Sequence, residues 1–168
     1  MDTFILIGIT GIGLGALYFL VASGLSLIYG LMGVLNFAHG SFLTVGAFVG
    51  YWIATKLGPE TSMVDFVIAM IVGGLAAGLF ALAMEQLLIT RLYERHIDQA
   101  LVTVGVSLVV GAVLAGWFGN DLIMFPTPMW FLTAINVGGA MIPADRVVYI
   151  ATAVLLLIGN WVLLKYTR

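Results

Sequence analysis

GLMGVLNFAHGSF, residues 30–42, lies inside the longest tract of the chain without a charged residue. No Asp, Glu, Lys or Arg occurs from Thr3 to Thr55. One membrane-spanning helix needs about 20 apolar residues, so this tract predicts two spans with a short connection. Hydrocarbon disfavours the polar side chains of Asn36 and His39, so the stretch that holds them predicts a break between two helices.

The composition of the whole chain predicts a membrane protein. Its 168 residues are 62% hydrophobic and 8% charged, whereas soluble domains are roughly 45–50% apolar and about 25% charged. The mean hydropathy of +1.18 indicates lipid as the solvent. A net charge of −2 argues against nucleic acid as a partner, because phosphate binding needs a basic surface. The lack of cysteine excludes disulfides and thiolate chemistry.

The positions of the polar residues predict an all-α, polytopic helical bundle with a helix break near 31–40. We expect it to form a single transmembrane domain over residues 1–168. The five expected spans cover residues 4–30, 40–56, 64–88, 100–118 and 147–164. The connection 119–146 is rich in proline, glycine and aromatic residues, which predicts an interfacial loop with a short surface helix. A docking surface for an extracytoplasmic partner is the alternative.

The basic residues of the short loops predict the orientation, because Lys and Arg favour the cytoplasmic side. Segment 85–98 and the C-terminal end hold two basic residues each, whereas loops 56–65 and 119–146 hold one each. We therefore place segment 85–98 and the C-terminus in the cytoplasm. The N-terminus then lies outside if the first uncharged tract crosses the membrane twice.

Glycine pairs with four-residue spacing occur in three of the expected spans. They are Gly11 and Gly15, Gly46 and Gly50, and Gly74 and Gly78. This spacing puts both glycines of a pair on one helix face, where another backbone can approach closely. The pairs predict that these helices pack on one another or on a partner.

The break is the leading candidate for a functional site. The expected solute-pathway residues are Gly33, Asn36, Phe37, His39, Gly40 and Ser41. Ionisable groups at membrane depth usually face a bundle interior or a water-filled cavity, and transporters place broken helices at their substrate sites. The alternative is a plain turn at the cytoplasmic surface, with Asn36 capping the helix that starts near Phe37. The residues by themselves leave both interpretations open.

Catalytic and metal chemistry are disfavoured by the same residues. Ser23, Ser26 or Ser41 could pair with His39 in an intramembrane hydrolase, but no G-x-S-x-G motif or orienting carboxylate accompanies them. Small hydroxyls in spans mostly bond backbone carbonyls. Two histidines, expected in different layers, do not predict a metal site.

Glu85 is interpreted as a carboxylate at headgroup level that pairs with Arg91 or with solvent. A titratable group in a solute path is the alternative interpretation. Glu94, Arg95 and Asp98 continue a loop of mixed charge, which is typical of a solvated surface or of a contact with a cytoplasmic subunit.

Two longer stretches carry a resemblance to a known family. Residues 24–52, GLSLIYGLMGVLNFAHGSFLTVGAFVGYW, and 84–110, MEQLLITRLYERHIDQALVTVGVSLVV, are similar to permeases of branched-chain amino acid ABC importers. The first of the two permease types of that family is the most similar, and urea-importer permeases share the NFAHG motif. The resemblance covers residues 8–118 and, more loosely, 147–168. Many relatives have a glutamate where Ser41 stands, so a role for that carboxylate is not carried over.

The resemblance implies a subunit that is not an enzyme and moves branched-chain or related amino acids across the cell inner membrane by alternating access. It implies a second permease subunit, cytoplasmic ABC ATPase subunits and a periplasmic solute-binding protein as partners. ATP would bind the ATPases, so this subunit is expected to hold no cofactor, and the chain contains no P-loop motif. The NFAHG residues would lie beside the translocation route.

Relatives in this family are longer, and the chain stops where a cytoplasmic coupling loop is expected after Lys165. We therefore expect a C-terminally truncated permease that lacks the coupling loop and later spans. Two other functions stay open on the sequence: a urea or amide importer permease of the same family, and a small helical channel or assembly subunit that works without ATPases.

Overall fold

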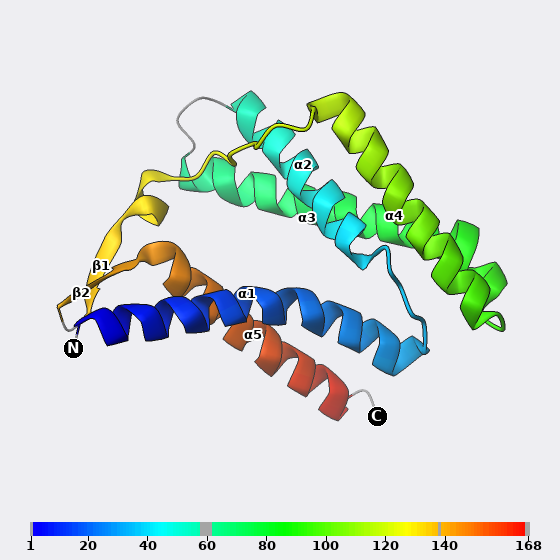
Figure 1. Ribbon diagram of the computed structural model, residues 1–168, viewed down its shortest axis with the longest axis horizontal. Helices are drawn as coiled ribbons and strands as arrows, with labels where there is room; N and C mark the ends of the chain where they lie inside the picture. Colours follow the sequence, from blue (N-terminus) through cyan, green and yellow to red (C-terminus); the bar gives the residue numbers. More distant parts are fainter. Residues whose placement is uncertain (1, 58–61, 138, 167–168) are drawn as a thin grey trace. The chain divides into compact units, whose positions relative to one another are not determined.

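A computed structural model describes residues 2–57, 62–137 and 139–166 of the chain (Figure 1). Within these ranges the chain forms five α-helices, which confirms the predicted all-α class, and one two-stranded sheet. The helices are α1 (Asp2–Met32), α2 (His39–Leu57), α3 (Met63–Met84), α4 (His96–Phe118) and α5 (Ala144–Tyr166). The strands are β1 (Ala134–Val137) and β2 (Ala140–Pro143).

The chain divides into two compact units. One comprises residues 1–24 and 129–168, and the other comprises residues 25–128. The second unit holds the helix break, α2, α3 and α4, and therefore contains the predicted solute-pathway residues. The single transmembrane domain over residues 1–168 stays a prediction.

Four helical stretches in the described part of the chain are long and apolar enough to cross a membrane. They are residues 3–31, 63–92, 96–118 and 144–166. Helix α2 lies where a span over 40–56 was predicted, but it is not among these four. His39 and Lys56 lie inside this 19-residue helix, and small or hydroxyl-bearing residues take many of its other positions, so its apolar content is lower.

The ends of two helices follow from local chemistry. Helix α3 begins after a capping box, in which the Ser62 hydroxyl accepts from the Asp65 backbone N–H and the Asp65 carboxylate accepts from the Ser62 N–H, both at 3.2 Å. Helix α1 is followed by Gly33, whose φ of +66° is in the left-handed region. Glycine takes this conformation without a Cβ penalty, which is why α1 can end there.

Helices α2 and α3 pack against each other through small residues (Figure 1). A Cβ added to Gly46 would lie 3.0 Å from the carbonyl oxygen of Gly73, and one added to Gly50 would lie 3.1 Å from that of Ala69. Residue numbers fall along α3 as they rise along α2, so the two helices are antiparallel. Close backbone approach of this kind drives helix association in lipid, where apolar burial contributes little.

The core of the second unit lies around the helix break. Its buried residues are Val34, Ala38, Phe42, Met84 and Ile89. The rings of Phe42 and Phe80 pack edge to face at 5.7 Å between centroids, which continues the α2–α3 contact toward the break. The break therefore lies level with the C-terminal end of α3.

The connection 119–146 contains the expected short helix, a 3-10 turn at Met129–Leu132, and a β-hairpin that was not predicted. The loop interpretation is therefore wrong over Ala134–Pro143. Val137 pairs with Ala140 in the antiparallel register, so two residues connect the strands. Gly139 has a φ of +93°, and a glycine pair between two apolar runs is a strong local signal for such a hairpin.

Candidate solute-pathway site

The break between α1 and α2 alternates between buried and exposed residues. Val34, Asn36 and Ala38 are buried, whereas Leu35 and Phe37 are exposed. These three buried residues lie at alternate positions, so one side of the break packs into the core of the second unit. The polar amide of Asn36, only 8% exposed, belongs to the packed face.

Asn36 shapes the turn that starts α2. Its side-chain oxygen accepts a hydrogen bond from the Ala38 N–H at 2.9 Å, and its backbone carbonyl accepts from the His39 N–H at 3.3 Å. An asparagine that bonds the backbone two residues on forms a turn of its own. The capping role and the buried break, which were alternatives on the sequence, are thus both present at this residue.

Helix α4 holds the other side of the break. The Thr103 hydroxyl accepts a hydrogen bond from the Phe37 N–H at 3.2 Å and donates one to the Ala100 carbonyl at 2.9 Å. Thr103 is fully buried. The break exposes backbone groups that no helix pairs, and this threonine satisfies one of them. A movement of α4 would therefore shift the backbone at Phe37.

Gln99 lies one helical turn before Thr103 and is also fully buried. Neither its side-chain oxygen nor its side-chain nitrogen has a hydrogen-bond partner in the described part of the chain. A buried amide without a partner is destabilising. Sequence reasoning missed Gln99 and Thr103, and the signal that could have found them is two polar residues at i and i+4 in an apolar helix.

The remaining predicted pathway residues divide by exposure. Ser41 is buried near the start of α2, and His39 is half-buried with its ring edge-on to Phe42 at 6.2 Å. Gly33 and Gly40 are exposed, and a Cβ added to either would meet nothing within 4 Å. The role of these residues in solute passage stays a prediction.

The predicted glycine pairs differ in their surroundings. Gly46 and Gly50 both lie in the α2–α3 contact described above. Their partner on α3 is Gly73, where an added Cβ would lie 2.5 Å from the Gly46 carbonyl oxygen. No atom lies within 4 Å of a Cβ built on the other four glycines in the described structure, which are Gly11, Gly15, Gly74 and Gly78.

A cavity of about 280 Å³ opens beside the break. Ile28 and Val34 line it on the side of α1 and the break, and α3 contributes several apolar residues. Two polar residues also line it, Asn36 and Glu85. The cavity is small for a drug-sized ligand, since such sites run from about 300 to 1,000 Å³, and suits a smaller molecule.

Glu85 opens a π-helical turn, Glu85–Ile89, at the end of α3. One extra residue in such a turn redirects the side chains, and π-turns are frequent at functional sites. The Glu85 carboxylate accepts a hydrogen bond from the Tyr93 hydroxyl at 3.0 Å, and no ion pair to Arg91 is present in the described residues. The predicted pairing with Arg91 is therefore wrong, because the π-turn and the 3-10 turn after it bring Tyr93 to the carboxylate instead.

The pKa of Tyr93 depends in part on the Glu85 carboxylate. Burial raises the pKa of Tyr93, and the hydrogen bond to Glu85 and the negative charge of Glu85 raise it further. Each effect favours the neutral phenol over the phenolate. The phenol is thus a stable donor to Glu85 at neutral pH.

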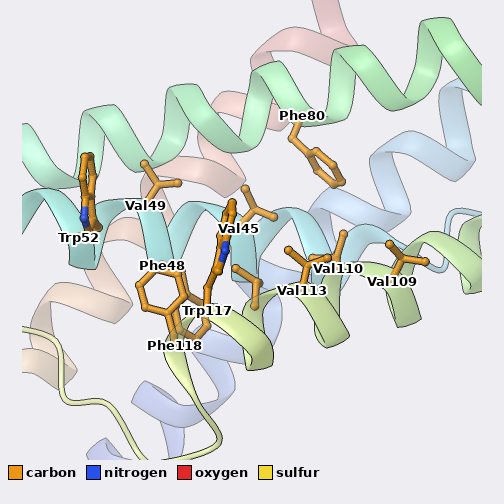
Figure 2. A pocket seen from close by; sticks show the side chains of 11 residues that line it. Val45, Phe48, Val49, Trp52, Phe80, Val109, Val110, Val113, Trp117 and Phe118 are labelled. Carbon is orange, nitrogen blue, oxygen red and sulfur yellow. The ribbon is translucent and has the colours of Figure 1, made fainter.

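A larger cavity, of about 720 Å³, lies between α2 and α4 (Figure 2). Phe48 and Phe118 pack against each other in its wall at 4.6 Å between ring centroids, and Trp117 lies beside them in Figure 2. Its other lining residues are valines, leucine, tryptophan and phenylalanine. No lining side chain carries a charge or an amide, so this cavity has nothing to pair with the charged groups of an amino acid.

Metal binding has no support in the described residues, since no group of three or more His, Asp or Glu side chains is placed to hold an ion. His39 begins α2 and His96 begins α4. The Arg95–Asp98 ion pair, at 3.5 Å, is largely exposed. Exposed ion pairs contribute only about 0–1 kcal/mol to stability. The pair is therefore consistent with the predicted solvated loop.

Comparison with known proteins gives a family and several partial relatives. A family described as "Branched-chain amino acid transport system / permease component" matches residues 7–168. The high-affinity branched-chain amino acid transport system permease protein LivH of Escherichia coli (strain K12) is 40% identical over 47 residues, which is 28% of this chain and 15% of LivH. LivH of Salmonella typhimurium gives the same values. BraD of Pseudomonas aeruginosa is 35% identical over 49 residues, which is 29% of this chain and 16% of BraD.

The match to these curated relatives thus spans 15% to 16% of their length. No solved structure matches the chain. The family match covers nearly the whole chain and agrees with the resemblance that residues 24–52 and 84–110 carry. The chain therefore belongs to the family of branched-chain amino acid transport system permease components and is a multi-pass membrane protein of a transporter family, not an enzyme.

Proposed function

We propose that this chain is the transmembrane subunit of an ABC importer that moves branched-chain or related amino acids across the cell inner membrane. Its partners are a second permease subunit, cytoplasmic ABC ATPase subunits and a periplasmic solute-binding protein. The family and the transport systems named for LivH and BraD support this assignment. At most 11% of the most apolar part of each of the four membrane-length stretches is buried, which also supports a chain whose helices meet lipid and other subunits.

The solute passes beside the helix break, along Asn36, His39 and Ser41. The observation that carries this proposal is the buried Asn36 amide at the edge of the 280 Å³ cavity. Irregular backbone at membrane depth persists where it is buried in protein or lines a water-filled cavity, and transporters use such breaks at their substrate sites. Gly33, Phe37 and Gly40 complete the segment that bends around this route.

Segment 85–98 and the C-terminus face the cytoplasm in this proposal, as the distribution of Lys and Arg supports. We also propose that α2 crosses the membrane. Its 19 residues extend about 28 Å at 1.5 Å per residue, close to the roughly 30 Å hydrocarbon core. Helix α2 also packs antiparallel along α3, whose apolar stretch is long enough to cross. The break and its cavity then lie toward the cytoplasmic side.

Alternating access requires that the break have two arrangements. Thr103 links the break to α4 through the Phe37 N–H, so a shift of α4 would move the backbone beside Asn36. ATP-driven closure of the ATPase subunits would supply that shift. The break would then open the cavity to one side of the membrane at a time.

Uptake of radiolabelled leucine into membrane vesicles that hold the chain and its partner subunits tests the proposal. Asn36→Ala and His39→Ala should each lower ATP-driven uptake roughly fivefold to tenfold, as expected when about 1–1.5 kcal/mol of hydrogen bonding is lost. The matched control is Asn160→Ala in α5, which should leave uptake unchanged. Equal membrane levels of all variants separate this effect from a failure of insertion.

Three results would contradict the proposal in different ways. Normal uptake in both break variants would remove these residues from the route. Accumulation of urea in place of leucine would favour the urea-importer alternative. Uptake that persists without ATP would favour a channel that works without ATPases.

A further inference from the structure

The cavity beside the break combines a mostly aliphatic lining with two polar residues. Most of its lining is aliphatic, from Ile28, Val34, Met84 and Ile89 among others. Its polar lining residues, Asn36 and Glu85, come from separate segments, the break and the π-turn after α3. A ligand that fills it must offer an apolar body and groups that pair with an amide and a carboxylate.

Glu85 has the capacity to bind a cation. Its Oε1 atom accepts a hydrogen bond from Tyr93, and Oε2 makes no hydrogen bond or ion pair within the described part of the chain. A partly buried carboxylate without a compensating charge is costly in an apolar environment, and an ammonium group placed against it removes that cost. Ionisable residues within membrane spans usually mark a solute pathway for this reason.

Asn36 has a complementary capacity. Its side-chain oxygen is used by the Ala38 N–H, and this hydrogen bond also identifies which side-chain atom is the oxygen. The amide NH₂ makes no hydrogen bond in the described part of the chain and carries two donors. Those donors suit a carboxylate, which accepts hydrogen bonds and donates none when ionised.

We infer that Glu85 binds the α-ammonium group of an amino acid in this cavity, with Asn36 donating to its α-carboxylate and the aliphatic lining holding its side chain. This inference rests on the proposed function and deepens it. Glu85 is then a specificity-determining residue that favours a zwitterionic amino acid over a neutral solute such as urea. Neither uncharged molecules nor carboxylic acids without an amine gain the pairing with Glu85.

A purely structural role for Glu85 is the competing explanation. The carboxylate could serve only to hold Tyr93 and thereby fix the π-turn. The two roles separate at Tyr93, because Tyr93→Phe removes the hydrogen bond and leaves the carboxylate in place. If Glu85 binds an ammonium group, Tyr93→Phe is tolerated, whereas under the structural role it is as damaging as Glu85→Gln.

The test is equilibrium binding of radiolabelled leucine to the purified full chain in lipid nanodiscs. Glu85→Gln should weaken leucine binding by about tenfold or more, since it removes one partner of a charge pair. Tyr93→Phe should stay within about threefold of the wild type, as one neutral hydrogen bond is lost. Glu94→Gln removes a carboxylate from the exposed loop nearby and should have no effect.

Two leucine analogues make the assignment to the ammonium group sharper. The amine 3-methylbutylamine lacks the carboxylate and should displace leucine from the wild type but not from Glu85→Gln. The acid 4-methylpentanoate lacks the ammonium group and should displace leucine weakly from both proteins. Equal displacement by the two analogues, normal binding in Glu85→Gln, or equal losses in Glu85→Gln and Tyr93→Phe would overturn the inference.

This binding measurement is independent of transport. A chain that binds leucine through Glu85 but shows no ATP-driven uptake would contradict the proposed function and keep the inference. Normal ATP-driven leucine uptake by the Glu85→Gln variant would contradict the inference and keep the proposed function. Absence of leucine binding to the wild-type chain in nanodiscs would contradict the inference by itself.

Discussion

Two cavities of the second unit differ in their polar lining, and the smaller of these two is the better candidate for an amino-acid solute. The larger, about 720 Å³ between α2 and α4, is lined by aliphatic and aromatic side chains (Figure 2). The smaller, about 280 Å³ beside the break, includes Asn36 and Glu85. A zwitterion that leaves water must regain the interactions of both charges, which only the smaller cavity offers. Volume alone therefore does not identify a site for a charged solute.

The two cavities share a wall, which makes them a matched pair within one unit. Phe80 lines the larger cavity, and the next residue of α3, Ala81, lines the smaller one. On α2, Val45 lines the larger cavity and Phe42 lines the smaller one. The antiparallel contact of α2 with α3 therefore positions both cavities, and substitutions on either side can break or sharpen the comparison.

The largest effect is expected when a charge enters the larger cavity. Val113→Asp puts a carboxylate on α4 where no lining residue can pair with it, and the upper limit of the cost is the value for a charge at a span centre, about 2.5–3.5 kcal/mol. The midpoint of thermal unfolding in detergent should fall, and so should the amount of the protein found in the membrane. The control Val113→Leu should stay near the wild type in both measurements. Unchanged stability of Val113→Asp would mean that water fills this cavity. The difference in polarity between the two cavities would then be refuted.

A smaller loss is expected at the close contact between α2 and α3. Gly73→Ala places a Cβ 2.5 Å from the Gly46 carbonyl oxygen, so α2 and α3 must separate. Overpacking of this kind costs about 1–3 kcal/mol and should lower the unfolding midpoint. Gly74→Ala, one residue along, adds a Cβ that meets nothing within 4 Å and serves as the control. Equal midpoints for the two variants would refute the close α2–α3 contact.

The link between the break and α4 should contribute less. Thr103→Val keeps the shape of the side chain and leaves the Phe37 N–H without its acceptor, which costs about 1–3 kcal/mol if that group stays buried and less if water reaches it. We expect a small fall in stability and a larger fall in leucine uptake. Thr152→Val on α5, in the other unit, also removes a hydroxyl that bonds a backbone carbonyl and serves as the control. If both variants behave alike, Thr103 has no role in the break.

The smallest effect is a titration shift next to the smaller cavity. Glu85→Gln removes the negative charge that helps to raise the pKa of Tyr93 and turns an ionised acceptor into a neutral one, so that pKa should move down toward 10.0. Burial, the largest cause, remains, so the pKa should stay above 10.0. NMR of ¹³C-labelled tyrosine during a pH titration measures the shift. A pKa of Tyr93 that does not change would place the carboxylate away from the phenol.

The helices could largely be predicted because their signal is one-dimensional. Long apolar runs between polar segments locate α1, α3, α4 and α5 to within a few residues, since lipid requires each crossing segment to satisfy its own backbone. The hairpin at 134–143 was missed because two four-residue strands give a weak periodic signal inside an aromatic-rich loop. Its glycine pair was visible in the sequence but was read as loop composition.

The candidate site was only half predictable. Asn36 and His39 are conspicuous because they are polar in an uncharged tract, and a polar residue in such a tract is a functional hypothesis by itself. Glu85 was considered as a titratable group in a solute path only as an alternative, and Gln99 and Thr103 were missed, because all three lie far from the break in the sequence and look like ordinary residues of a helix end. Likewise, four-residue spacing selected Gly74 on α3, whereas the contact uses Gly73, because the rotation of a helix about its axis depends on its neighbours.

The sequence by itself determined that this is a multi-pass helical membrane protein, where its helices lie, and where the first of them breaks. These properties follow from the cost of exposing polar groups to hydrocarbon, which acts on each segment separately. Only the tertiary structure decided that the break meets the end of α3 and the first turns of α4, which brings Asn36 and Glu85 to one cavity and Thr103 to the break. That arrangement depends on packing between segments some 50 to 70 residues apart, as in the bond from Phe37 to Thr103 across 66 residues, and no local pattern encodes it.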